Sequence, residues 1–305
     1  PTVGIGGLTL GGGIGHNTRW AGLTCDHLQQ TRLVSAQGEV LTASPGDHSD
    51  LFWALRGGAG GSFGVNTTFT FDLVEVPTAP VTNFSLTWRG ADAAGLVLRA
   101  FQDLMQEAPP QFGAYVVVTP LDPGESGRRR GIDVSLAGHF IGSEHDLRDL
   151  IAPLLATKTP PVSQAIVEMP FWASQERLIE PPAAAHAFAD ISRYANTPLP
   201  DEVIQKIVGL IVDCPYRTVD AHGALVLFGW VGGNLAHGDP ADIGIAAQSA
   251  QATPGVALLP SSRERGSRSS GGGKVYSILG KIGTASPTTL PAGSLPHCAS
   301  FATAS

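Results

Sequence analysis

The chain has 305 residues, a formal net charge of −7 and a pI of about 5.7; 43% of its residues are hydrophobic and 15% are charged. This balance supplies a buried core for one large domain or two ordinary ones and excludes disorder of the whole chain. The acidic charge and the lack of a basic stripe exclude nucleic acid as a partner. No apolar run approaches the roughly 18 residues that a membrane helix needs, so we expect no membrane partner.

The three cysteines, Cys25, Cys214 and Cys298, lie far apart and form no CxxC pair. This spacing supports neither a zinc site nor a disulfide framework, so we predict isolated thiols and no metal. The chain begins at Pro1, without a methionine or a signal-peptide pattern, and enters a glycine-rich run at once. We therefore expect a preceding segment to be missing, which leaves the compartment open: the cytoplasm if the source is bacterial, or secretion.

Residues 1–78 carry two glycine clusters separated by a hairpin signal. The first cluster, within 1–17, has so many glycines that we expect neither a regular helix nor a long strand there. Two β-prone runs within 31–42 flank Gln37-Gly38 and predict a hairpin, because glycine tolerates the positive φ of a tight turn. The remaining predictions are a short helix over 50–55 capped by Ser49 or Asp50, a second glycine cluster over 56–64 and a strand within 65–74.

Pro77 and Pro80 punctuate the chain, and we place a domain boundary after residue 78. Strand-like runs and helical spacing alternate over 79–237, which favours an antiparallel sheet covered by helices over βαβ winding. The predicted strands are 81–88, 112–119, 132–141 and 224–231, and the predicted helices are 92–107, with apolar spacing at Leu96, Val97, Ala100, Phe101 and Leu104, 143–155, capped by Ser143, and 200–212. Small and polar residues dominate 238–305, so we expect a divergent or disordered tail there.

Glycine-rich loops suit a nucleotide, because several backbone N–H groups can approach an anionic phosphate where no Cβ intervenes. The common fingerprints are missing: GGGIGH over 11–16 lacks the last glycine of G-x-G-x-x-G, and the sequence contains no G-x-x-x-x-G-K-[ST]. For one cluster alone, tight turns in a β-rich domain are the favoured alternative. Two clusters joined by Asp26 and a hairpin shift the balance towards a nucleotide site.

The run VGIGGLTLGGGIGHNTRWAGLTCDHL, over 3–28, resembles the second flavin-binding segment of berberine-bridge-enzyme-like oxidases, in the vanillyl-alcohol-oxidase superfamily. The family pattern is VGxGG, GGGxG, R and GLxxD, and here Arg19 and Asp26 supply the last two. The run DLFWALRGGAGGSFGVNT, over 50–67, is similar to the family's DLFWAxRGGGGGSFGVVT except at Ala59 and Asn66. Two such motifs at this separation are a specific signal, and the resemblance extends more weakly through the substrate domain to residue 233.

The resemblance implies an α+β fold. Residues 1–78 are expected to be the second half of a PCMH-type FAD-binding domain, and residues 79–237 an antiparallel-sheet substrate domain covered by helices. FAD is the implied cofactor, and the implied substrate is an alcohol, sugar, amine or alkaloid-like small molecule, which transfers a hydride to the flavin N5 before O2 takes the electrons. The sequence carries no signal of the oligomeric state.

Carried over position by position, the resemblance makes the glycine loops the FAD contacts. Arg19 and Arg56 could meet phosphate, but structural ion pairs are favoured, and Trp53 is expected in the core. For Asp26, capping of nearby backbone N–H groups explains the carboxylate at least as well as a ligand contact does. The predicted cofactor-binding residues are Val3, Gly4, Gly6, Gly7, Gly11, Gly12, Gly15, Asp26, Gly64 and Val65.

The sequence lacks the family's first flavin segment, with the histidine that often attaches to the flavin, and its C-terminal Asn-Tyr motif. We therefore name no catalytic residue; Tyr115, His139 and His222 lie on strand-like runs and are expected to be packing or surface residues. We expect the isolated chain to be an incomplete, weakly active fragment of low solubility. Two alternatives are a non-catalytic small-molecule-binding or assembly module derived from such an oxidase, and a Rossmann-type dehydrogenase, which the missing fingerprint disfavours.

Overall fold

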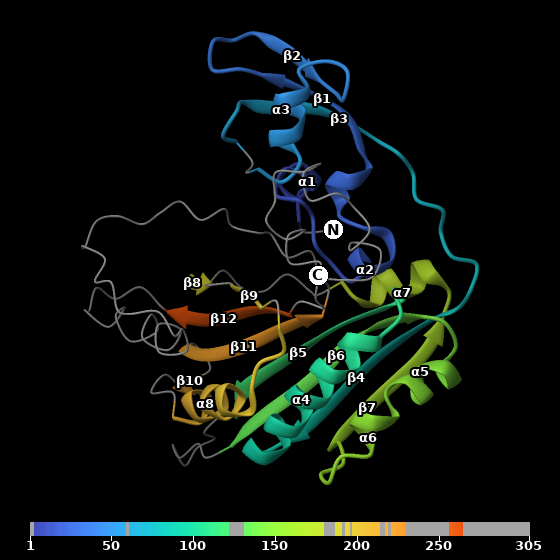
Figure 1. The fold of residues 1–305 in the computed structure, drawn as a ribbon, viewed down its shortest axis with the longest axis vertical. Coiled ribbons are helices and arrows are strands. Elements are labelled where there is room, and N and C mark those ends of the chain that lie inside the picture. The colour runs from blue at the N-terminus through green and yellow to red at the C-terminus, as the bar shows by residue number, and fades with distance from the viewer. Residues whose placement is uncertain are drawn as a thin grey trace.

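The computed structural model describes residues 3–58, 61–121, 131–179, 187–190, 193–195, 197–213, 217–218, 221–229 and 256–264. These residues form a three-stranded antiparallel sheet near the N-terminus and a nine-stranded antiparallel sheet beyond it (Figure 1). The fold is therefore α+β, with an antiparallel sheet covered by helices, as the resemblance implies. None of the helices described is both long enough and apolar enough to cross a bilayer.

The three-stranded sheet has the order β2–β1–β3 and is built on the predicted hairpin. β1 (Leu28–Val34) pairs with β2 (Val40–Ala43), and the φ of 82° at Gly38 in the turn between them confirms the predicted role of this glycine. β3 (Val65–Phe71) pairs with the other side of β1. The core of this unit joins the strands to α1 (Ile5–Leu10) and α3 (Ser49–Leu55) and consists of Leu10, Leu28, Leu33, Ala43, Phe52 and Leu55.

Helix α1 corrects the prediction that the first glycine cluster contains no helix. Two of its six residues are glycines, and each is about 1 kcal/mol less favourable than alanine in a helix interior. The helix forms because Leu10 is buried in the core of the three-stranded sheet, and because Thr9 Oγ1 donates to the Ile5 carbonyl at 2.7 Å. Tertiary burial thus outweighs the poor propensity of a short helix.

Two details of the predicted helix near residue 50 are wrong. The N-cap of α3 is His48 rather than Ser49 or Asp50; it has a φ of 50°, in the left-handed region, and its side chain makes no capping hydrogen bond. Trp53 is 46% exposed rather than in the core, because this short helix buries the face that carries Phe52.

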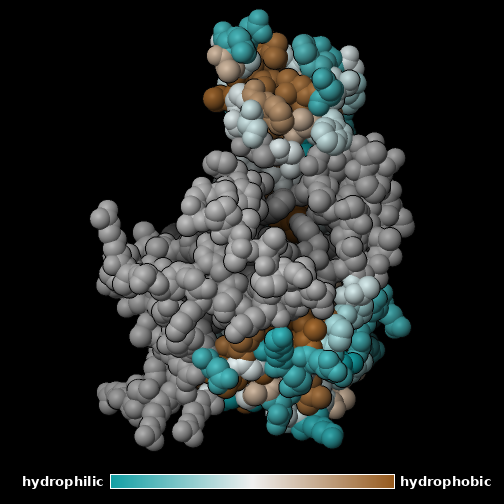
Figure 2. All heavy atoms as spheres, turned by 60° about the vertical axis from the view of Figure 1, so that its left-hand side comes forward, coloured by the Kyte–Doolittle hydropathy of each residue, from teal (hydrophilic) through white to brown (hydrophobic). Residues whose placement is uncertain are grey.

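Apolar side chains gather on one face of the unit around the three-stranded sheet, at the top of Figure 2. A contiguous exposed patch of this kind marks an interaction surface or an aggregation liability. The exposed large apolar residues of this unit are Ile5, Val40, Trp53, Phe63, Val65, Leu73 and Val74.

The nine-stranded sheet has the order β7–β4–β6–β5–β11–β12–β8, and β10 pairs with β11 and β9 with β12. The strands predicted from the sequence are β4 (Val81–Arg89), β5 (Phe112–Pro120), β6 (Ile132–Ile141) and β11 (Ala221–Gly229). The others are β7 (Ser163–Met169), β8 (Ala187–Asp190), β9 (Arg193–Ala195), β10 (Arg217–Thr218) and β12 (Val256–Glu264).

One face of this sheet carries the main hydrophobic core, and the opposite face carries polar side chains. Four helices lie over the first face (Figure 1), namely α4 (Ala91–Glu107), α5 (Glu144–Leu150), α6 (Ala152–Leu155) and α8 (Asp201–Val212). Strand residues alternate between the two faces, so Phe84 and Leu86 of β4 lie in the core. Asn83, with its register partner His139 on β6, lies on the opposite face.

The predicted helix over 143–155 begins as expected but is divided. Ser143 Oγ accepts from the Asp146 N–H at 3.1 Å, which confirms the predicted cap. Ile151 ends α5 and caps α6, whose first turn contains Pro153. Proline has no N–H to donate to the preceding turn, so the single predicted helix becomes two.

Three elements carry little sequence signal. β7 is an edge strand whose residues are mostly exposed, so its sequence lacks apolar alternation. Helix α7 (Phe171–Arg177) has only seven residues. β12 lies within 238–305, where we expect a tail, and pairs with β11.

We predict that Phe101→Ala lowers the free energy of unfolding by about 3–5 kcal/mol, because Phe101 is fully buried between α4 and the sheet. Leu96 belongs to the same apolar spacing but is 38% exposed, so Leu96→Ala should cost about 1 kcal/mol or less. Urea denaturation of the two variants measures the difference. Equal losses would contradict the observed orientation of α4.

Candidate functional site

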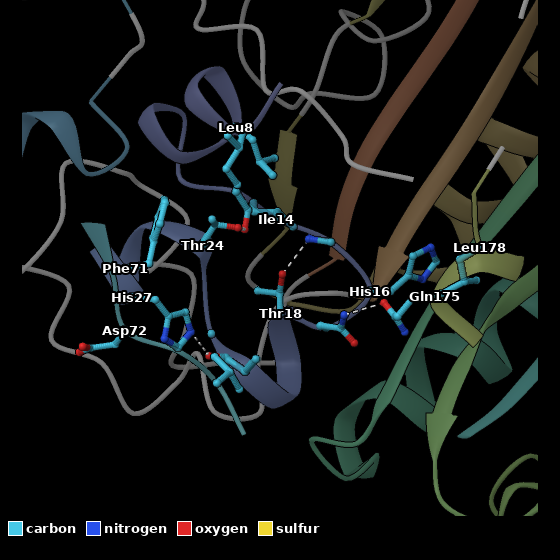
Figure 3. Close-up of a pocket in the computed structure, with 17 residues that line it drawn as sticks. Leu8, Ile14, His16, Thr18, Thr24, His27, Phe71, Asp72, Gln175 and Leu178 are labelled. Atoms are coloured by element: carbon cyan, nitrogen blue, oxygen red, sulfur yellow. Dashed lines mark hydrogen bonds between the residues drawn. The ribbon is translucent and has the colours of Figure 1, made fainter. Parts of the chain in front are cut away.

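A cavity of about 440 Å³ lies between the N-terminal segment, the end of β3 and helix α7 (Figure 3). Residues from 5–8, 13–18, 21–27 and 71–74 form most of its wall, and Gln175 and Leu178 close the side that faces α7. A volume of this order is typical of pockets that hold small molecules and cofactors.

Positive φ angles at two glycines fold the GGGIG loop back onto η1 (Thr24–His27). Gly12 and Gly13 have φ angles of 103° and 84°, which favour glycine. The Gly13 carbonyl accepts from the Thr24 N–H at 3.1 Å, and the Gly12 carbonyl accepts from the Cys25 N–H at 2.9 Å. A Cβ on Gly13 would also overlap the Thr24 side chain, so only glycine fits at this position.

The folded loop leaves backbone donors beside the cavity. The Gly15 N–H donates to Thr18 Oγ1 at 2.7 Å, but no group in the described part of the chain accepts from the N–H of Gly13 or Ile14. Gly13 is buried, and a buried N–H without an acceptor is costly. A cofactor that brings phosphate or carbonyl oxygens into the cavity would satisfy these donors, so the residues present fit such a cofactor.

Of the predicted cofactor-binding residues in the described part of the chain, Gly15 is the one that lines the cavity. Helix α1 contributes its apolar side chains Ile5 and Leu8 to the wall instead of its glycines. The other predicted contacts of this cluster lie in or beside α1: Val3, Gly4, Gly6, Gly7, Gly11 and Gly12.

The described part of the second glycine cluster lies outside the cavity wall. A Cβ on Gly64, which has a φ of 146°, would overlap the Val34 carbonyl, and a Cβ on Gly58 would overlap the Ala54 carbonyl. Val65 is 70% exposed at the start of β3. These close backbone approaches are those of tight turns, the alternative explanation of a glycine cluster.

Asp26 and the two arginines have structural partners. Asp26 Oδ2 accepts from the Leu23 N–H at 2.8 Å, and Oδ1 lies 3.8 Å from Arg56 Nη2, as expected for a cap and an ion pair. Arg19 is buried, and its Nη2 donates to the Ala108 carbonyl at the end of α4 at 2.7 Å. Burial lowers the Arg19 pKa to about 10. This arginine ties the loop to the nine-stranded sheet unit.

A partly buried polar cluster beside the cavity contains residues that the sequence did not predict as cofactor contacts. The His16 ring centroid lies 5.5 Å from that of Tyr115 and 5.8 Å from that of His139. Asn17 Nδ2 donates to Gln175 Oε1 at 3.0 Å, and Gln175 Nε2 lies 3.5 Å from His139 Nδ1. The only sequence signal is that His16 and Asn17 follow the GGGIG motif directly; their contacts depend on tertiary structure. The side chain of His222 lies outside the described residues.

Burial determines the charge state of these groups. It lowers the pKa of His16 to about 4 and that of His139 to about 3, where nearby His16 contributes further, so both rings are neutral at pH 7. Burial raises the pKa of the Cys25 thiol to about 12, so this predicted isolated cysteine stays protonated. Cys214 and Cys298 lie outside the described residues.

We predict that Gly13→Ala lowers the free energy of unfolding by about 2–5 kcal/mol, because alanine is strained at positive φ and its Cβ would overlap Thr24. Gly209 in α8 is a matched control: no atom lies within 4 Å of where its Cβ would be. Gly209→Ala should leave the stability unchanged or raise it by up to about 1 kcal/mol. Thermal melts of both variants test this, and a Gly13→Ala protein as stable as the parent would contradict the loop geometry.

We predict that the protein loses stability as the pH falls from 6.5 towards 4. The pKa values of His16 and His139 in the folded protein lie below 6.5, the usual pKa of a solvated histidine, so the unfolded chain takes up protons first. Each histidine should contribute a slope of up to about 1.4 kcal/mol per pH unit. His139→Leu should flatten the pH dependence of the urea midpoint, whereas His145→Leu, at an exposed position in α5, should not. A slope that His139→Leu leaves intact would contradict the buried neutral histidines.

The sequence comparisons agree with this geometry. Residues 1–44 match the family described as FAD binding domain. Berberine bridge enzyme-like 7 of Arabidopsis thaliana is 32% identical over 68% of the chain and 41% of its own length. Glucooligosaccharide oxidase of Sarocladium strictum is 35% identical over 51% of the chain and 29% of its own length. The FAD-linked oxidoreductase YgaK of Bacillus subtilis is 37% identical over 52% of the chain and 34% of its own length. The chain thus spans well under half of these relatives.

Solved structures show the same fold. A BBE-like 1 variant of Physcomitrella patens aligns with a TM-score of 0.72 at 25% identity, over 92% of the chain and 58% of that structure. A berberine bridge enzyme variant in complex with (S)-reticuline aligns with a TM-score of 0.75 at 22% identity, over 92% and 55%. By motif, sequence and fold, the chain is a relative of the berberine-bridge-enzyme-like FAD-linked oxidoreductases over the part of those proteins that it spans.

Proposed function

We propose that the protein is an FAD-dependent oxidoreductase in which residues 1–78 bind the cofactor and residues 79–237 bind the substrate, with 238–305 as a divergent tail. The observation that carries the proposal is a coincidence of sequence and geometry. The segment that matches the FAD binding domain, 1–44, supplies most of the cavity wall, including two loop N–H groups that have no acceptor within the described residues.

The GGGIG loop is the proposed cofactor contact. The N–H groups of Gly13 and Ile14, which line the cavity, would donate to cofactor oxygens, as glycine loops do for nucleotide phosphates. Apolar side chains of Ile5, Leu8 and Phe71 line the same cavity and would exclude water from a bound ring. The remaining sequence-predicted contacts stay proposals: Val3, Gly4, Gly6, Gly7, Gly11, Gly12, Gly15, Asp26, Gly64 and Val65.

Bound FAD supplies the redox chemistry, by accepting a hydride at the flavin N5 and passing the electrons to O2. The residues of this chain hold the ring, exclude water and orient the substrate beside it. The proposed substrate is an alcohol, sugar, amine or alkaloid-like small molecule. Similar proteins support this class, since they include a glucooligosaccharide oxidase and an enzyme solved in complex with (S)-reticuline.

We predict saturable FAD binding that Ile14→Asp weakens at least about tenfold, because a carboxylate beside the Gly13 and Ile14 amides repels the diphosphate and competes for its donors. Val40→Asp places the same charge at a 59% exposed position on β2 and should leave binding unchanged. Quenching of flavin fluorescence measures both affinities, with NADH as a competitor. Absence of FAD binding by the parent protein would refute the proposal, and displacement by NADH would favour a dehydrogenase.

A further inference from the structure

Among the described residues of the nine-stranded sheet unit, one polar side chain lines the cavity. Helix α7 contributes Gln175, whose carboxamide lies beside His16 at the cavity wall (Figure 3). Most of the rest of the wall comes from the segment matched by the FAD binding domain. Gln175 is therefore a polar group through which this unit can contact a ligand bound by the N-terminal segment.

Two contacts fix the orientation of this carboxamide. Asn17 Nδ2 donates to Gln175 Oε1 at 3.0 Å, and Gln175 Nε2 donates to His139 Nδ1 at 3.5 Å. His139 can accept because it is 1% exposed, and burial lowers its pKa to about 3, which keeps the ring neutral. The imidazole thus selects one of the two possible amide orientations.

After these two contacts, the carboxamide still has hydrogen-bonding capacity for a ligand. A carboxamide has two N–H donors and two oxygen lone pairs, and each contact uses one of them. One N–H and one lone pair of the same carboxamide remain for a ligand, on a side chain that lines the cavity. Their complement is a group with an adjacent acceptor and donor, such as the carbonyl and imide N–H at the edge of a flavin ring.

We propose that Gln175 determines specificity by hydrogen-bonding the imide edge of the flavin ring, and that His139 is a positioning residue that orients the carboxamide. This inference rests on the proposed function. The cavity also suits a ring: Ile5, Leu8 and Ile14 provide apolar surface, and the described residues of the wall include neither Lys nor Arg.

The test compares Gln175→Leu with the parent protein by FAD titration and by the reduction potential of the bound flavin. Loss of two hydrogen bonds should weaken FAD binding about ten- to a hundredfold. The potential should become more negative, because an N–H donor to a ring carbonyl stabilises the electron-rich reduced ring. Gln164→Leu, at an exposed position on β7, is the matched control and should change neither value.

Positioning by His139 has its own readout. His139→Leu removes the acceptor and frees the amide to flip, so it should weaken FAD binding and shift the potential in the same direction as Gln175→Leu, but less. His139→Asn keeps an acceptor near the position of Nδ1 and should restore most of both values. If neither His139→Leu nor His139→Asn changes the FAD affinity and the reduction potential, the positioning role is wrong. It is also wrong if the two variants change these values equally.

The outcomes distinguish a failure of the proposed function from a failure of the Gln175 contact. If the parent protein binds no FAD, the proposed function itself fails. If the parent binds FAD and Gln175→Leu keeps the parent's FAD affinity and reduction potential, the imide contact is wrong. If Gln175→Leu changes only the KM of a substrate, Gln175 contacts the substrate instead of the flavin. Should Gln175→Leu fold poorly, Gln175→Glu replaces it; the carboxylate repels ring carbonyls, so weakened binding is again expected and unchanged binding overturns the contact.

Discussion

The cavity exists because the loop after the first glycine cluster packs directly on the polar face of the nine-stranded sheet. The backbone of His16 approaches Gly113 of β5 so closely that a Cβ on Gly113 would overlap the His16 carbonyl. Arg19 then anchors the following turn to the end of α4. A glycine in a central strand normally weakens it, and here it is needed because another backbone comes into contact.

This packing buries polar groups that a purely structural interface would avoid. His16 and His139 lose their charged forms, and Arg19 is removed from water with its charge. Strongly perturbed ionisable groups gather at functional sites more than elsewhere, because a stable fold gains little from them. Their position beside the cavity supports the same location for the site as the N–H groups of Gly13 and Ile14 do.

Much of the fold follows from the sequence, because its signals are local. Gly38 marks the hairpin turn, Ser143 caps α5, and alternating residues such as Phe84 and Leu86 mark β4. The elements that the sequence did not predict share a cause: they form because of tertiary contacts. α1 depends on the burial of Leu10, and β7 is recognised as a strand only by its pairing with β4.

Some features of the candidate site also follow from local sequence, and others depend on tertiary contacts. The GGGIG motif predicts a nucleotide-binding loop, and the comparisons bear out the FAD-binding family over 1–44. The glycine-rich sequence alone does not distinguish Gly13, which needs its positive φ, from the glycines of the preceding VGIGG run that lie within α1. Gln175 carries no such signal, because its proposed role depends on a contact across 158 residues of chain.

That sequence separation has a consequence for assembly. Asn17 and Gln175 meet only when the N-terminal segment packs against the nine-stranded sheet unit, and closing so long a loop costs entropy. A molecule held between the loop and α7 would bind the assembled form and not the separated sheets. By mass action, such a molecule would stabilise the contact between the N-terminal segment and α7, so it would contribute to the stability of the fold as well as to the chemistry.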